Sequence, residues 1–170
     1  MRNPSVLLLL LLGACGTQDS LSNNGAPIAA PGETPSVPAQ AVQTATLVGL
    51  YESGGSGTGN QMCVLDRATG NARFGLVVRG AGEQGCSGAG EAVRQGDTLR
   101  LTMAGDEACT IEARIEGTRI AFPAQLAPGC AYYCSSGAGM AGVTLDKTGG
   151  TPEDAMRAVD LVGDRLCAGR

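Results

Sequence analysis

Apolar and polar residues alternate with a period of two over most of the chain after residue 46. This pattern is typical of half-buried β-strands, because successive side chains of a strand point to opposite faces. Leu99, Leu101 and Met103, for example, alternate with threonine and arginine. Glycine, asparagine and aspartate separate the alternating segments and predict turns. The pattern predicts strands over residues 46–52, 60–66, 72–79, 87–94, 98–103, 108–115, 118–123 and 142–147.

Consecutive strands joined by short turns, with no helical pattern between them, describe an antiparallel meander. Closure of such a meander removes its exposed edges. The fold class that we expect is therefore mainly β: a small antiparallel up-and-down β-barrel stapled by disulfides, with one short C-terminal α-helix. A two-sheet β-sandwich is the alternative.

The C-terminal segment breaks the alternation. Thr151 precedes a proline and two acidic residues, which is a strong signal for the start of a helix. Apolar residues then recur at helical spacing, at Ala155, Val159, Val162 and Leu166. This predicts a short amphipathic helix at about 152–163 that lies against the barrel.

The first fifteen residues have the composition of an export signal. One positive charge, Arg2, precedes a leucine-rich run of about ten residues, which is too short to span a bilayer. The run ends in Leu12-Gly13-Ala14-Cys15, which resembles the bacterial lipobox. This resemblance implies that residues 1–14 are a signal peptide and that Cys15 becomes the lipidated N-terminus of the mature protein. An ordinary cleaved signal is the alternative.

Residues 15–46 contain four prolines, many small residues and only two charges. Such a composition cannot bury a core, so it predicts a disordered tether behind the lipidated cysteine. The single β domain with its helix then covers residues 47–170. Gly16, rather than aspartate, follows Cys15, and by resemblance to lipoproteins of enteric bacteria this implies an outer-membrane anchor facing the periplasm.

The domain is poor in aromatic residues, with no tryptophan, two phenylalanines and three tyrosines in the whole chain. A core built from smaller side chains buries less area and needs reinforcement. An even number of cysteines in an exported domain predicts three disulfides. These cysteines are Cys63, Cys86, Cys109, Cys130, Cys134 and Cys167. With no histidine and no closely spaced thiol pair, we expect no metal site.

The pairing of these cysteines stays open, because six of them allow about 15 arrangements. Position along the chain favours Cys63 with Cys86, since one lies in a predicted hairpin and the other just after it. The remaining four would then pair as Cys109 with Cys130 and Cys134 with Cys167.

Several short motifs between residues 46 and 103 resemble those of a known family. They are Gly49-Leu50-Tyr51, Cys63-Val64-Leu65, Cys86, and Gly96 ahead of Leu99 and Leu101. In these motifs the chain is similar to the Inh-type bacterial metalloprotease inhibitors, although Tyr51 replaces the first tryptophan of that family. The resemblance implies an eight-stranded barrel with a disulfide near Cys63 and Cys86. It also implies an inhibitory segment near residues 42–46 that enters the protease cleft.

Common catalytic devices are missing from the sequence. Without histidine, neither a Ser-His-Asp nor a Cys-His arrangement can form. The adjacent acids Asp106-Glu107 and Glu153-Asp154 are explained as a turn and a helix start. We therefore expect a binding protein rather than an enzyme, with no cofactor. The formal charge of −4 argues against a nucleic-acid partner.

Tyr132 and Tyr133 form a possible binding surface that the sequence indicates. They lie between Cys130 and Cys134, so disulfides would hold these amphipathic rings in place. The alternative is that the rings cover a disulfide or one end of the barrel.

Together these observations predict a lipid-anchored protein of the bacterial cell envelope, attached to the membrane through Cys15. Its partner would be a protein, and inhibition of a protease or lysozyme is one such role. The alternative is a structural or accessory envelope lipoprotein that contacts another envelope component. A small-molecule carrier is disfavoured, because about eight strands leave room for side chains or one small ligand.

Overall fold

The structure is a computed structural model that describes residues 46–54, 59–67, 70–105 and 109–168. The predicted signal peptide, Cys15 and almost all of the predicted tether lie outside these residues. The described residues fall within one compact unit, residues 42–170.

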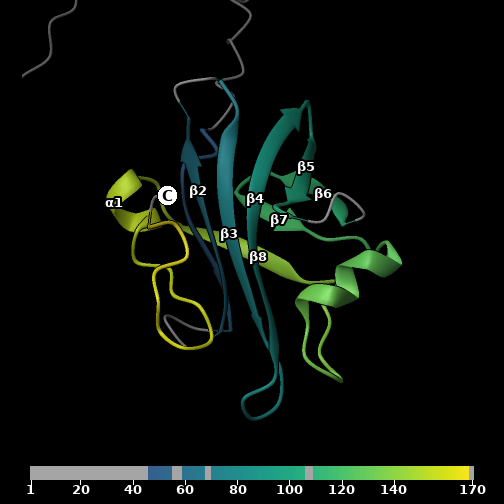
Figure 1. Cartoon of the computed structure of the whole chain (residues 1–170). Helices are drawn as coiled ribbons and strands as arrows, with labels where there is room; N and C mark the ends of the chain where they lie inside the picture. Colours follow the sequence, from purple (N-terminus) through teal and green to yellow (C-terminus); the bar gives the residue numbers. More distant parts are fainter. Residues whose placement is uncertain (1–45, 55–58, 68–69, 106–108, 169–170) are drawn as a thin grey trace, which may run out of the picture. The chain divides into compact units, whose positions relative to one another are not determined.

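Eight antiparallel strands form a closed barrel in which each strand pairs with the next and β8 pairs with β1 (Figure 1). The strands are β1 (Gly49–Ser53), β2 (Asn60–Asp66), β3 (Ala72–Arg79), β4 (Gly85–Gln95), β5 (Thr98–Met103), β6 (Thr110–Glu116), β7 (Arg119–Ala121) and β8 (Thr144–Gly149). A 3₁₀ helix, η1 (Pro128–Tyr133), lies between β7 and β8, and a short helix, α1 (Pro152–Ala155), follows β8. The expected up-and-down barrel is confirmed, and the sandwich alternative is wrong.

The interior of the barrel is filled by one face of every strand. Its largest fully buried side chains are Phe74, Met62, Leu76, Leu99, Leu101, Met103, Ile111, Ile120 and Leu145. All but one are aliphatic or thioether side chains, as the composition predicted. Eight strands leave an interior that side chains of this size can fill.

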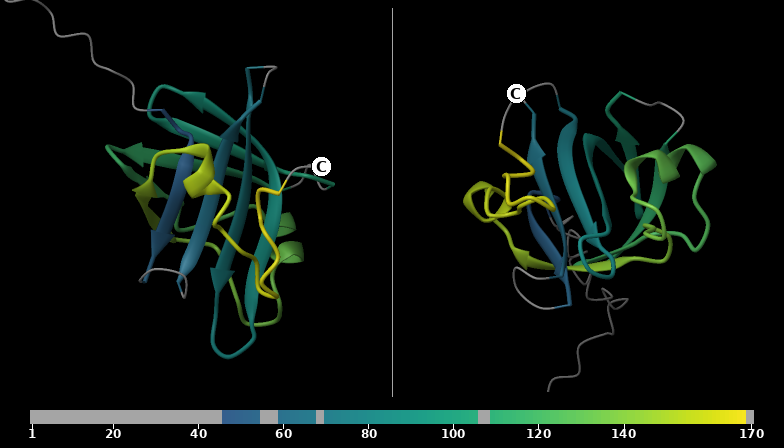
Figure 2. Two further views of the ribbon diagram at one scale, coloured as in Figure 1. Left: turned by 90° about the vertical axis from the view of Figure 1, so that its left-hand side faces the viewer. Right: turned by 60° about the horizontal axis from the view of Figure 1, so that its bottom comes forward.

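The outer face of β1 and β2 is buried as well. The residues 152–168, which we call the C-terminal strap, run across this face on the outside of the barrel (Figure 2). A second apolar cluster forms there from Val48, Leu50, Cys63, Leu65, Ala155, Ala158 and Cys167. Burial on both faces explains why residues 62–65 are apolar without a break, a pattern that alternation alone does not produce.

Hydrogen bonds from β2 and β3 hold the backbone of the strap. They join Arg73 Nη2 to Cys167 O (2.9 Å), Arg79 Nη2 to Asp160 O (3.0 Å), and Val159 N to Gln61 Oε1 (3.1 Å). Gly75, between the two arginines, is required by the close approach of the strap. A Cβ atom there would lie 2.8 Å from Leu166 O and 2.9 Å from Leu166 Cβ.

The predicted helix over about 152–163 is wrong in length, because α1 ends at Ala155. Its start is as predicted: Thr151 and Asp154 form a reciprocal capping box. Beyond Met156 the chain finds other partners. Asp160 Oδ1 accepts hydrogen bonds from the backbone N–H groups of Val162 and Asp164, and this local turn replaces further helix.

Three disulfides join all six cysteines of the domain, as predicted. The pairs are Cys63–Cys167, Cys86–Cys134 and Cys109–Cys130. The expected Cys109–Cys130 pair is confirmed, whereas the other two expected pairs are wrong. Cys63 faces the strap while Cys86 belongs to the interior cluster, and β3 separates their strands. Strands separated by one other strand, as β2 and β4 are, lie about 9.6 Å apart, which is beyond the reach of a disulfide.

The two ends of the barrel carry different parts of the chain. β1 begins at the end where β4 turns into β5, at Gly96, and β6 turns into β7, at Gly117. We call this the N-terminal end. The turn between β3 and β4 and the long connection that contains η1 lie at the opposite end (Figure 1). The described chain therefore enters the barrel at one end and presents Tyr132 and Tyr133 at the other.

Candidate functional site

The two tyrosines predicted as a binding surface lie next to each other in η1 but differ in exposure. Tyr132 is 81% exposed, while Tyr133 is partly buried. Their rings meet edge to face, with centroids 5.4 Å apart. The Tyr133 hydroxyl donates a hydrogen bond to Ala104 O at 3.1 Å, and its ring packs over Gly88. Tyr133 thus covers the barrel, as the alternative stated, and supports Tyr132, which faces outward.

Disulfides fix η1 at Cys130, within the helix, and at Cys134, which follows it. Cys130 is bonded to Cys109, ahead of β6, and Cys134 is bonded to Cys86 of β4. Three hydrogen bonds join Ser135 to Gly85. The Ser135 N–H and hydroxyl donate to Gly85 O at 2.9 and 3.1 Å, and Ser135 Oγ accepts from the Gly85 N–H at 2.9 Å. Residues 128–135, which we call the tyrosine loop, are therefore held in place by covalent bonds and hydrogen bonds to β4 and to Cys109.

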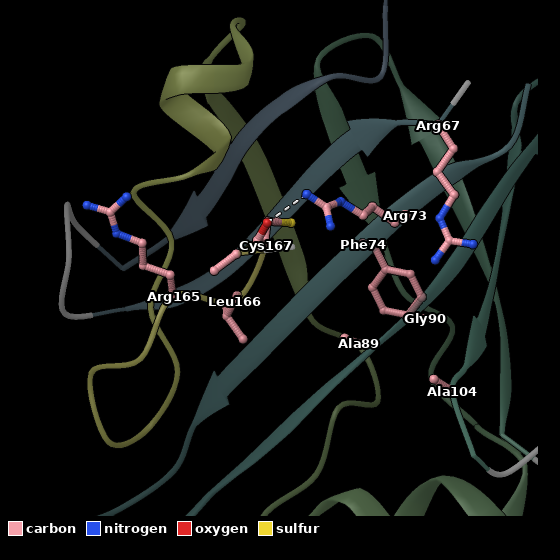
Figure 3. A pocket seen from close by; sticks show the side chains of 10 residues that line it. Arg67, Arg73, Phe74, Ala89, Gly90, Ala104, Arg165, Leu166 and Cys167 are labelled. Carbon is pink, nitrogen blue, oxygen red and sulfur yellow. Dashed lines mark hydrogen bonds between the residues drawn. The ribbon is translucent and has the colours of Figure 1, made fainter. Parts of the chain in front are cut away.

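A second feature, which the sequence did not reveal, is a pocket of about 410 Å³ beside the strap (Figure 3). Three arginines line it, Arg67, Arg73 and Arg165, together with the edge of Phe74 and the backbone of Gly90. Positive charge of this kind suits carboxylate or phosphate groups. The three arginines come from distant segments of the chain, so no local motif indicates them.

The geometry of this pocket does not bring the three cations together. Arg67 forms an ion pair with Glu91 at 2.7 Å, and Arg73 donates to the carbonyl of Cys167. Figure 3 shows the guanidinium group of Arg165 directed away from the other two. We therefore interpret the pocket as the place where hydrogen bonding attaches the strap to β3. Its three guanidinium groups do not converge on one anion site.

The N-terminal end of the barrel holds the first described residues by side chains of β1 and β8. Lys147 Nζ donates a hydrogen bond to Thr46 O at 2.6 Å, and the Tyr51 hydroxyl donates to Leu47 O at 2.9 Å. Lys147 Nζ also lies 5.7 Å from the centroid of the Tyr51 ring, within range of a cation–π contact. The chain thus enters β1 from a fixed point.

Burial changes the ionisation of both groups. It raises the pKa of Tyr51 to about 12, against the opposing effect of Arg94, and it lowers the pKa of Lys147. The protonated hydroxyl of Tyr51 is uncharged and is tolerated in an apolar site, whereas the charged phenolate would lose its hydration there. Burial therefore favours the protonated form.

Tyr51 should therefore ionise near pH 12 instead of pH 10 when the folded protein is titrated at the phenolate absorption band. Because the folded state holds this proton more tightly than the unfolded chain, its contribution to stability is complete below pH 10 and is lost as the pH rises towards 12. Tyr51→Phe should remove the late transition. An unchanged titration curve in that variant would contradict the assignment.

Within the described ranges, no three cysteine, aspartate or glutamate side chains gather as a metal site. No helix in that part of the chain is long and apolar enough to cross a bilayer. Cys15, the predicted lipidation site, lies outside the described residues.

Comparison with known proteins adds no relative. No protein-family model, no curated protein and no solved structure matches the chain.

Proposed function

We propose that the protein is a lipid-anchored protein of the bacterial cell envelope that acts by binding another protein through the outer surface of its barrel. The main observation behind this proposal is that side chains fill the interior of the barrel. Met62, Leu76 and Leu101 are fully buried among the other core side chains. A partner must therefore contact the outside, where the tyrosine loop and the N-terminal end offer rigid surfaces.

Two independent features support the location. The sequence before Cys15 resembles a lipoprotein signal, and the domain depends on three disulfides. Disulfides persist in oxidising compartments such as the periplasm and are rare in the cytosol. Both features favour a chain that is exported and then anchored through Cys15.

The class of partner that we propose first is a protease. In the Inh-type inhibitors, which the β domain resembles, a segment ahead of the barrel enters the protease cleft. The corresponding segment here would end at Thr46, whose carbonyl is held by Lys147. A segment that emerges from a fixed point loses less conformational freedom on binding than a loose one.

Replacing Cys15 with serine should move the protein from the membrane to the soluble fraction, because the residue that carries the lipid is lost. The measurement is detergent phase partition of cell extracts, with intact mass of the mature protein before and after reduction. The native form should show an acyl addition on Cys15, and it should gain six hydrogen atoms on reduction of its three disulfides. A soluble native protein that begins elsewhere would exclude the anchor.

The inhibitor role is tested by titrating the mature protein against a metalloprotease, a serine protease and a lysozyme. Inhibition that weakens in Lys147→Ala, with the fold intact, would support the N-terminal end as the inhibitory site. Val162→Ala, on the strap, is the matched control. If none of the enzymes is inhibited, a structural or accessory role in the envelope becomes the better explanation.

A further inference from the structure

The pocket beside the strap has a disulfide in its wall. Cys167, which is bonded to Cys63, lines the pocket, and three arginines share the same wall: Arg67, Arg73 and Arg165. The volume of about 410 Å³ is within the range of small-molecule sites. Cys63 is fully buried in the apolar cluster under the strap and does not line the pocket. A molecule in the pocket therefore meets the disulfide from the side of Cys167.

The wall of this pocket is positively charged. Arg73 Nη2 donates a hydrogen bond to Cys167 O at 2.9 Å, and Figure 3 shows the guanidinium group of Arg73 directed at Cys167. Glu91, which pairs with Arg67 at 2.7 Å, compensates one of the three arginines. Three positive charges and one negative charge leave a local charge of +2, in a chain whose formal charge is −4. An anion that approaches this wall is attracted to it.

The groove at η1 offers a comparison. This groove, of about 250 Å³, is lined by Cys130 and Cys134, one cysteine from each of the other two disulfides. Its lining residues are all uncharged, and residues 120–145 contain no aspartate, glutamate, lysine or arginine. Of these two cavities, the one beside the strap has the charged wall. Charge therefore distinguishes Cys63–Cys167 from the other disulfides.

We propose that the pocket beside the strap is a thiol–disulfide exchange site, at which a small thiol that carries carboxylate groups opens the Cys63–Cys167 bond before the other two. Exchange requires a thiolate, and its rate depends on access to the attacked sulfur. The pocket gives access to Cys167, and its positive charge raises the local concentration of an anionic thiol. The site is separate from the surfaces proposed for binding a partner protein.

The exchange passes through a mixed disulfide. The thiolate of the small molecule forms a bond to the sulfur of Cys167 while the bond to Cys63 breaks, and Cys63 leaves as a thiolate. Cys63 then takes a proton from water, and Gly75 O, 3.7 Å from its sulfur, accepts a hydrogen bond from the new thiol. A second thiolate attacks the sulfur of the attached small molecule, and Cys167 leaves and is protonated in turn. Two small thiols are thereby oxidised to one disulfide, and the protein disulfide is reduced to two thiols.

Opening this bond loosens the cover of the outer face of β1 and β2. Cys63 and Cys167 belong to the outer apolar cluster, whereas Cys86, Cys109 and Cys130 belong to the interior cluster. Without the bond, the strap is held on the barrel by hydrogen bonds and apolar contacts alone. The other two disulfides have no part in this attachment, because neither of them includes a residue of the strap.

The test compares three small thiols of different charge on the native, mature protein: 2-mercaptosuccinate, 2-mercaptoethanol and cysteamine. Alkylation stops the exchange early, and peptide mass spectrometry gives the fraction of each disulfide that has opened. With 2-mercaptosuccinate, Cys63–Cys167 should open at least about tenfold faster than either of the other bonds. This ratio should fall at least about fivefold with cysteamine, whose amine is cationic. A ratio of bonds within one protein cancels the different intrinsic reactivities of the three thiols.

Two side chains of the same ion pair provide matched variants with opposite effects. Arg67→Gln removes a positive charge from the pocket wall and should lower the ratio about twofold, while Glu91→Gln removes the compensating charge and should raise it by a similar factor. Both side chains are about half exposed and pair with each other, so the fold should be kept. Thermal unfolding checks this. General loosening of the fold would instead change the ratio in the same direction in both variants.

Several outcomes would overturn the proposal. They are earlier opening of either of the other two disulfides by 2-mercaptosuccinate, the same ratio for all three thiols, an early adduct on Cys63 instead of Cys167, and changes of the same sign in the two variants. Opening through global unfolding would expose the three bonds alike, so equal rates would also contradict an exchange site in the folded protein.

Discussion

Replacing Cys63 and Cys167 together with alanine should lower the free energy of unfolding by about 5 kcal/mol. The bond closes a loop of 104 residues, and the entropy that such a cross-link removes from the unfolded chain is worth about 4.7 kcal/mol for a loop of this length. Loosening of the outer apolar cluster adds to the loss. Urea unfolding followed by circular dichroism measures the change.

The matched control is the double replacement of Cys109 and Cys130, whose loop of 21 residues predicts a smaller loss of about 3 kcal/mol. The Cys63 and Cys167 variant should also bind a hydrophobic dye more strongly, because a detached strap exposes Val48, Leu50 and Leu65. If that variant were as stable as the wild type, the strap would not depend on its disulfide.

Phe74→Ala should cost about 4 kcal/mol of stability, the second largest effect that we expect. Phe74 has the largest of the fully buried side chains and is 2% exposed. Its loss would leave a cavity that the closed barrel cannot collapse to fill. Chemical denaturation with the disulfides intact gives the value.

Phe74→Leu is the conservative control for this site and should cost less than about 1.5 kcal/mol, because most of the buried volume is kept. A similar loss in both variants would mean that the ring contributes through its shape at the pocket beside the strap, where it forms part of the wall, and not through the volume that it fills.

The barrel could be predicted from the sequence because its strands and turns are encoded locally. The strands predicted over residues 60–66, 72–79 and 98–103 have the same bounds as β2, β3 and β5. The turn at Gly96 has a positive φ of 61°, as a tight turn between strands requires. In β7 the prediction was too long, because the pairing with β6 and β8 ends at Ala121.

The strap could not be predicted in the same way, since its conformation depends on distant partners. Thr151 and Asp154 start the helix locally, but its end is set by contacts such as that of Val159 with Gln61. Two of the three predicted disulfide pairings were wrong for a related reason. Because the residues around Cys63 are all apolar, no alternation shows which of them face the interior of the barrel. The strap that covers the outer face at Cys63 lies about 100 residues further along the chain.

The candidate site was predicted in part. The two tyrosines stood out as aromatic residues between cysteines, and the structure separates their roles: Tyr133 packs on the barrel and Tyr132 faces outward. A groove of about 250 Å³ is lined by uncharged residues of the segment 126–141, in and around η1. Only folding brings these residues together, so no spacing in the sequence could have indicated a groove.

The Cys63–Cys167 bond has a consequence for biogenesis. Cys63 belongs to the second strand, whereas its partner lies 104 residues further along the chain. During synthesis, the Cys63 thiol cannot form this bond until residue 167 has been made. Of the three disulfides, Cys63–Cys167 is therefore the last whose two partners are both present, and a polypeptide truncated before residue 167 is left with an unpaired thiol at Cys63.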